Sequence, residues 1–150
     1  MNALLFRFAV ACCFAGLLTA AELPTVAPGS EEWKAIYDPA FEKPTELPGD
    51  SELRRDLFDL IRPKAEKLAG APVKFQGNLR VYRNWAFFSG NSLDANGKPV
   101  QYPELQNSDT VALWLRTQDG WKVVDFAAGH SDAFFIIWPE QYGMPAELLK

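Results

Sequence analysis

The sequence predicts an α+β fold in which helices flank an antiparallel sheet along the chain. Apolar residues recur at helical spacing over residues 51–69, then alternate with polar residues from residue 73 to residue 126, and return to helical spacing after residue 133. Helices that precede and follow a run of hairpin-linked strands are typical of this class. We therefore expect a kinked helix packed on a curved antiparallel sheet of four to five strands, followed by a short C-terminal helix.

Residues 1–21 have the features of a secretory signal. Arg7 precedes an apolar stretch that is too short to span a bilayer, and residues 19–21 are the small residues that a signal peptidase requires. We expect cleavage after residue 21 and a protein exported to the periplasm or secreted. Lipidation at Cys12 or Cys13 is the alternative, and it is disfavoured because the apolar stretch continues past both cysteines.

Composition narrows the chemistry further. The chain has two cysteines, both within the predicted signal, and one histidine, so we expect no thiol nucleophile, no disulfide and no metal site built from cysteines or several histidines. The acids are scattered singly, so we expect no all-oxygen metal site either, and no cofactor. The 19 acidic and 15 basic side chains give a net charge of −4, which becomes −5 when Arg7 leaves with the signal. Nucleic acids and anionic membranes would repel such a protein, so we expect neither as a partner.

A proline-rich arm with one short helix is predicted over residues 22–50. Five of the eleven prolines lie here and discourage long regular structure. Ser30 can cap a helix over residues 31–37, whose first turn carries two acids that suit the helix dipole. Because a disordered tether rarely carries so many aromatic residues, we expect the arm to pack on a single domain over residues 51–150.

The strongest helix prediction covers residues 51–69. Asp50 or Ser51 is placed to cap its start, and Gly70 follows its end, where a left-handed residue is favoured. Pro63 lies inside the pattern and is expected to kink the helix, because it lacks a backbone N–H. The predicted apolar stripe consists of Leu53, Leu57, Leu60, Ile61 and Leu68.

The first predicted hairpin follows at once. Apolar side chains alternate over residues 73–81, with Gly77 as the expected bulge, and residues 83–84 form a tight turn into a strand over residues 85–89.

The second half of the sheet contains two more turns. Residues 96–97 (Asn-Gly) indicate a hairpin tip after which residues 100–102 pair back. Residues 110–117 and 121–126 form the clearest hairpin, joined by an Asp-Gly turn at residues 119–120. The C-terminal helix is expected over residues 133–141, capped by Ser131 or Asp132, with a last turn beginning at Pro145.

Three segments carry a resemblance to known proteins. LRRDLFDLIRPKAEKL, LRVYRNWAFFSG and GHSDAFFIIWPEQYGMPAELL resemble a family of exported bacterial proteins of uncharacterised function, over about residues 50–149. A kinked helix followed by strands that end in WKVVDF also resembles the cystatin-like or NTF2-like grouping of folds. That resemblance implies a long helix in the concave face of a curved sheet and, where NTF2-like proteins are enzymes, an acid or a His–Asp pair within the cone.

Candidate catalytic residues are few. His130, Ser131 and Asp132 are adjacent, so their side chains do not converge as a triad requires, and we interpret them as a loop and a helix cap. Strand periodicity places Asp125 on one face with Trp121 and Val123, opposite Lys122, Val124 and Phe126, at a sheet edge or in a partly buried site. Asp125, His130 and Asp132 form the set that could imitate an NTF2-like site.

Aromatic residues indicate a binding role more strongly. In residues 111–115 the residues Val111, Leu113 and Leu115 share one face, which leaves Ala112 and Trp114 on the other, so both faces of the sheet are apolar in places. One face suits the kinked helix, and the other needs cover from the arm, the terminal helix or a partner. The residues expected to contact a ligand or partner are Trp85, Trp114, Trp138 and Tyr142.

These observations favour an exported, non-enzymatic binding or accessory domain for a small apolar ligand or a protein partner. One alternative is an NTF2-like enzyme that acts on a small molecule with Asp125 or His130 as its base. Another is a periplasmic inhibitor or immunity-type protein.

Overall fold

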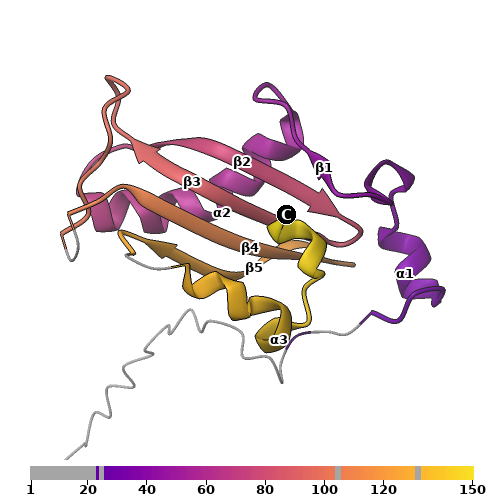
Figure 1. The fold of residues 1–150 in the computed structure, drawn as a ribbon. Coiled ribbons are helices and arrows are strands. Elements are labelled where there is room, and N and C mark those ends of the chain that lie inside the picture. Colours follow the sequence, from indigo (N-terminus) through magenta and orange to yellow (C-terminus); the bar gives the residue numbers. More distant parts are fainter. Residues whose placement is uncertain (1–22, 24–25, 104–105, 131–132) are drawn as a thin grey trace, which may run out of the picture.

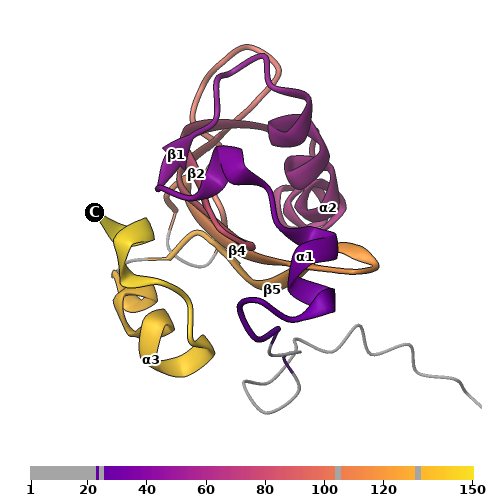
Figure 2. The same cartoon turned by 90° about the vertical axis from the view of Figure 1, so that its right-hand side faces the viewer.

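The computed structural model describes residue 23 and residues 26–103, 106–130 and 133–150. It has an α+β fold, in which a five-stranded antiparallel sheet lies between a long helix, α2, and a C-terminal segment (Figure 1, Figure 2). The strand order in the sheet follows the chain. The elements are β1 (Thr45–Glu46), α2 (Glu52–Ala69), β2 (Lys74–Tyr82), β3 (Trp85–Leu93), β4 (Asp109–Thr117) and β5 (Gly120–Ala128). The predicted signal, Cys12, Cys13, Ser131 and Asp132 lie outside the described residues.

The α2 helix begins and ends where the sequence predicts. The Ser51 side chain accepts a hydrogen bond from the Arg54 N–H, and Gly70 adopts the left-handed conformation with φ of 68°. Pro63 lies inside the helix, which continues past it as a single element. No described helix is both long enough and apolar enough to cross a membrane.

The buried face of α2 differs from the predicted stripe. Leu60 and Leu68 are 47% and 46% exposed, whereas Phe58 and Ala65 are buried beside the correctly predicted Leu57 and Ile61. The buried face of the helix is therefore rotated about the helix axis relative to the predicted stripe, away from Leu60 and Leu68 and toward Phe58 and Ala65. Phe58 lies in this core because its ring packs against the rings of Phe75 and Phe88.

Gly77 does not form the predicted bulge. β2 and β3 pair without interruption, Gly77 lies opposite Gly90, and β3 extends to Leu93. A Cβ atom at Gly90 would lie 2.2 Å from the Gln76 carbonyl oxygen and 2.7 Å from the Gly77 Cα. Glycine is required here by a close approach of two backbones, which a strand pattern read alone cannot distinguish from a bulge.

The hairpin tip at residues 96–97 is present, but the chain returns through an isolated bridge rather than a strand. Leu93 pairs with Pro99, and Gly97 has φ of 80°. The Asp94 side chain accepts hydrogen bonds from the backbone N–H groups of Asn96 and Lys98, which closes the turn.

A β-bulge lies in β5 and reverses part of the predicted alternation. Leu113 pairs with Asp125 and Trp114 pairs with Val123, so Val124 has no partner on β4. Beyond the bulge, Phe126 joins the core under α2, and Asp125 turns to the opposite face. The prediction that Asp125 shares a face with Trp121 and Val123 was therefore wrong, because one extra residue shifts a period of two.

Both faces of the sheet are apolar, as predicted, and both are covered within the chain. The core under α2 contains Ala112 and Trp114, and the second core, on the other face, contains Val111, Leu113 and Leu115. The C-terminal segment covers this second face with three buried side chains. These are Trp138, Met144 and Leu148.

Three short helical turns replace the single C-terminal helix that was predicted. They are the 3-10 helix η3 (Phe134–Ile137), α3 (Trp138–Tyr142) and the 3-10 helix η4 (Ala146–Leu149). Gly143, with φ of 71°, ends α3, and the last turn begins after Pro145, as expected.

The segment before α2 contributes to the sheet. Ser30 caps α1 (Glu31–Ile36) by accepting a hydrogen bond from the Trp33 N–H, as predicted. After the 3-10 helix η2 (Pro39–Phe41), β1 pairs with β2 and forms one edge of the sheet. Phe41 and Leu47, on either side of β1, are buried in the core under α2.

Candidate functional site

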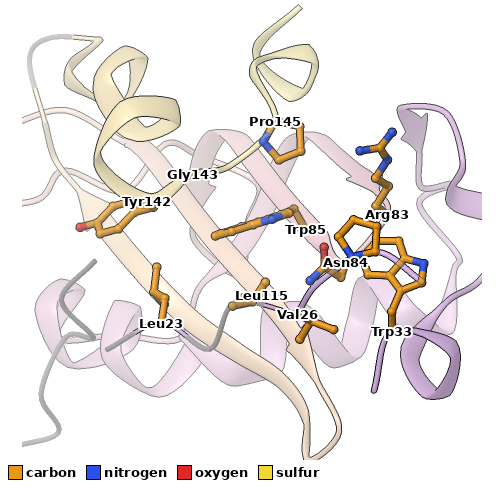
Figure 3. Close-up of a pocket in the computed structure, with 11 residues that line it drawn as sticks. Leu23, Val26, Trp33, Arg83, Asn84, Trp85, Leu115, Tyr142, Gly143 and Pro145 are labelled. Atoms are coloured by element: carbon orange, nitrogen blue, oxygen red, sulfur yellow. The ribbon is translucent and has the colours of Figure 1, made fainter. Parts of the chain in front are cut away.

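A pocket of about 240 Å³ opens where three distant segments of the chain meet (Figure 3). The segment before and within α1, the β2–β3 turn and the C-terminal segment each contribute to its wall. We call it the aromatic pocket. The residues that decide its chemistry are Trp33, Arg83, Asn84, Trp85, Tyr142 and Pro145.

The β2–β3 turn supplies the polar groups of this pocket. Tyr82 pairs with Trp85, so Arg83 and Asn84 form a two-residue hairpin loop. The Arg83 N–H donates a 2.7 Å hydrogen bond to the Phe41 carbonyl, and the Arg116 N–H donates one of 2.7 Å to the Asn84 carbonyl. These contacts from η2 and from the end of β4 hold the turn in place.

The Asn84 side chain forms no hydrogen bond within the described residues, and its amide atoms are accessible from the pocket. The residue is 8% exposed, and its amide lines the aromatic pocket, between Trp33 and Trp85 in Figure 3. The amide is therefore available to a molecule that enters the pocket.

Arg83 places a positive charge on the pocket wall. Its guanidinium carbon lies 4.9 Å from the centre of the Tyr82 ring, a cation–π distance. Among the described residues, no acid forms an ion pair with it. The pocket wall therefore carries one positive charge in a chain of net charge −4.

Tyr142 forms another wall and is fixed by hydrogen bonds on the far side of its ring. Its hydroxyl donates to Asp125 Oδ2 at 2.8 Å and accepts from Gln141 Nε2 at 2.9 Å. Burial, together with the hydrogen bond to Asp125 and the charge of that carboxylate, raises the pKa of Tyr142 to about 12. The ring is therefore neutral in the physiological range.

His130 lies in a different hollow of about 330 Å³ on the sheet face that the C-terminal segment covers in part. Asn91, Asp109 and Phe135 also line this hollow. The His130 ring packs edge-to-face against the Phe134 ring, with 5.2 Å between the ring centres. The backbone carbonyl of His130 accepts a hydrogen bond from Asn107 Nδ2. We call this 330 Å³ hollow the polar hollow.

The structure does not bring the candidate acid and base together. Asp125 is partly buried on the edge strand β5, and its second oxygen accepts a 2.7 Å hydrogen bond from the Phe126 N–H. Neither the aromatic pocket nor the polar hollow contains both Asp125 and His130. Asp132 lies outside the described residues.

Two of the four aromatic candidates line the aromatic pocket, namely Trp85 and Tyr142. Trp138 is 1% exposed, and Trp114 is fully buried on the opposite face of the sheet, under α2. Trp114 and Trp138 are thus core residues and offer no surface to a ligand. The spacing of residues along a strand or helix indicates which side a residue takes and not what covers it.

The sequence reasoning missed Trp33, Arg83 and Asn84 as pocket residues. One signal was present in the sequence: arginine occupies a two-residue hairpin turn, where glycine, asparagine or aspartate is usual. Arg83 indeed has φ of 54°, in the left-handed region.

In the described part of the chain, no three histidine, cysteine or acidic residues are grouped so that they could hold a metal ion. Comparison of the chain with protein-family models, curated proteins and solved structures finds no match. The resemblance to exported bacterial proteins therefore stays a prediction.

Proposed function

We propose that this chain is an exported, non-enzymatic binding domain whose aromatic pocket takes a small ligand. One observation carries the proposal: the amide of Asn84, which forms no side-chain hydrogen bond within the described residues, is accessible from a pocket walled by aromatic rings. Apolar walls with a few oriented polar groups are typical of small-molecule sites.

The architecture supports a fold-level likeness to the cystatin-like or NTF2-like grouping. Among the described residues, one long helix, α2, crosses one face of a five-stranded antiparallel sheet and lies between β1 and β2 in the chain. Since such folds host many unrelated functions, the likeness adds nothing about the ligand.

The contacts of Asp125 support binding over catalysis. Both of its carboxylate oxygens accept hydrogen bonds, one of them from Tyr142. A general base must instead reach the proton of a substrate. The enzyme alternative and the inhibitor or immunity-type alternative are not needed to account for the aromatic pocket.

Export is tested by N-terminal sequencing of the protein recovered from periplasm or culture medium. The expected first residue is Glu22, which follows the predicted cleavage site. Recovery of the uncleaved chain from the cytoplasm would contradict export without affecting the pocket.

Binding is tested with benzamide, which offers one aromatic ring and one amide. In NMR titrations we expect it to shift the Asn84 side-chain signals and the indole N–H signals of Trp33 and Trp85. The variant Asn84→Ala should lose most of this binding, whereas Asn78→Ala, at an exposed position of β2, should retain it. Equal effects of the two substitutions, or no shifts at these residues, would overturn the proposal.

A further inference from the structure

The wall of the aromatic pocket combines one cation with one amide, from consecutive residues. The Arg83 guanidinium forms no ion pair or hydrogen bond within the described residues, and its planar fork of donors suits a carboxylate. The adjacent Asn84 amide both donates and accepts, which matches a peptide-type amide in a ligand.

The backbone conformation of Arg83 supports a role of the Arg83 side chain in ligand binding. Its φ of 54° is a conformation that glycine and asparagine adopt more readily than arginine. The hydrogen bonds to Phe41 and from Arg116 maintain the turn around it. Unfavourable backbone conformations that persist in this way cluster at ligand sites.

The apolar part of the pocket limits the size of the ligand. Trp33, Trp85 and Leu115 line it, and its volume is about 240 Å³. Since an apolar cavity of about 150 Å³ accommodates benzene, this volume suits one ring or branched side chain with a few attached atoms.

We infer that the ligand is a small carboxylate in which an amide and an aromatic or branched apolar group flank the acid. N-acyl amino acids and the C-terminal residue of a peptide share this chemistry. In this assignment the carboxylate pairs with Arg83, the amide pairs with Asn84, and the apolar group lies against Trp33 and Trp85, all of which line the pocket. This inference rests on the proposed binding function and adds the class of ligand.

The test compares N-acetyl-L-phenylalanine with its neutral analogue N-acetyl-L-phenylalaninamide, by calorimetry on the full mature chain. The wild type should bind the acid about tenfold more tightly than the amide, because charge-assisted hydrogen bonds are the stronger ones. Added salt should reduce this preference. In Arg83→Gln the preference should disappear, while binding of the neutral amide is retained.

Arg80→Gln is the matched control, because Arg80 lies on β2, three residues before Arg83, but lines a different hollow. It should keep the tenfold preference. If the wild type binds acid and amide equally, or if Arg80→Gln loses the preference as Arg83→Gln does, the ligand class is wrong while the binding function survives. If benzamide and both phenylalanine derivatives fail to bind, the binding function itself is overturned.

A third probe, the tripeptide Gly-Gly-Phe, distinguishes the two sources of this chemistry. Binding at least as tight as that of N-acetyl-L-phenylalanine assigns a peptide terminus, and weaker binding assigns a free N-acyl amino acid. Both results support the inferred class, provided that Arg83→Gln weakens the binding of each acid.

Discussion

The Tyr142 hydroxyl donates a 2.8 Å hydrogen bond to the carboxylate of Asp125 and so joins the C-terminal segment to the edge strand of the sheet. The contact exists because the bulge at Val124 turns Asp125 toward that segment. The acid that the sequence singles out for catalysis is thus a structural support, which fixes one aromatic wall of the pocket.

This hydrogen bond predicts a specific loss of stability in alkali. The pKa of Tyr142 is raised from 10.0 to about 12 in the folded protein, so folding favours the protonated phenol. The resulting stabilisation is complete below pH 10 and is lost as the pH rises to about 12. In urea unfolding, the stability difference between wild type and Tyr142→Phe should be constant below pH 10 and shrink above it. Parallel alkaline curves for the two proteins would contradict the assignment.

The glycine pair of the first hairpin predicts a sharp steric effect. In Gly90→Ala the new Cβ would lie 2.2 Å from the Gln76 carbonyl oxygen, a backbone atom that cannot move alone. We expect a loss of about 1–3 kcal/mol in the free energy of unfolding. Gly49→Ala is the control, because nothing lies within 4 Å of its Cβ position. Equal stability of the two variants would show that β2 and β3 lie farther apart at Gly77 and Gly90 than the structure places them.

Trp114 predicts a contrast between two substitutions. Its ring is fully buried, and its indole nitrogen has no hydrogen-bond partner among the described residues. Trp114→Ala should cost about 3–5 kcal/mol through the cavity it leaves. Trp114→Phe should cost much less, because it retains a ring and removes an unsatisfied donor. Urea unfolding measures both values, and similar losses would imply that the N–H group is bonded in solution.

The C-terminal segment should contribute strongly to stability. Leu148 is fully buried in the core of the second sheet face, so Leu148→Ala should cost about 2–5 kcal/mol. Leu68→Ala is a suitable comparison, because Leu68 is 46% exposed on α2, and it should change stability by about 0.5 kcal/mol or less. Thermal unfolding of both variants checks this, and a Leu148 variant as stable as wild type would mean that the segment is not docked.

Arg83 predicts opposite changes in stability and binding. Arg83→Asn places a residue that tolerates φ of 54° in the turn and should raise the free energy of unfolding by about 1 kcal/mol. The same variant should lose the preference for a carboxylate. Denaturant unfolding and calorimetry on one preparation test both effects, and a destabilised variant would show that Arg83 contributes packing instead.

Local signals in the sequence predicted much of the fold. Ser51 and Gly70 bound α2 because capping depends on residues within one turn of the helix end. The hairpin of β4 and β5 follows from the Asp-Gly pair, although its two-residue loop is 118–119, since Gly120 already pairs with Thr117. Trp85 and Tyr142 were predicted to contact a ligand or partner, and both line the aromatic pocket. That prediction was based only on their aromatic side chains and not on their position in a pocket.

The remaining features depend on residues that are far apart in the chain. The bulge that turns Asp125 and the approach of Gly77 to Gly90 each need the partner strand, so a single strand's pattern does not contain them. The aromatic pocket brings Trp33 and the β2–β3 turn next to Tyr142 across about a hundred residues of sequence. Periodicity, caps and turns act between near neighbours and therefore specify the elements and their order. The site arises only when the sheet, α2 and the C-terminal segment pack together.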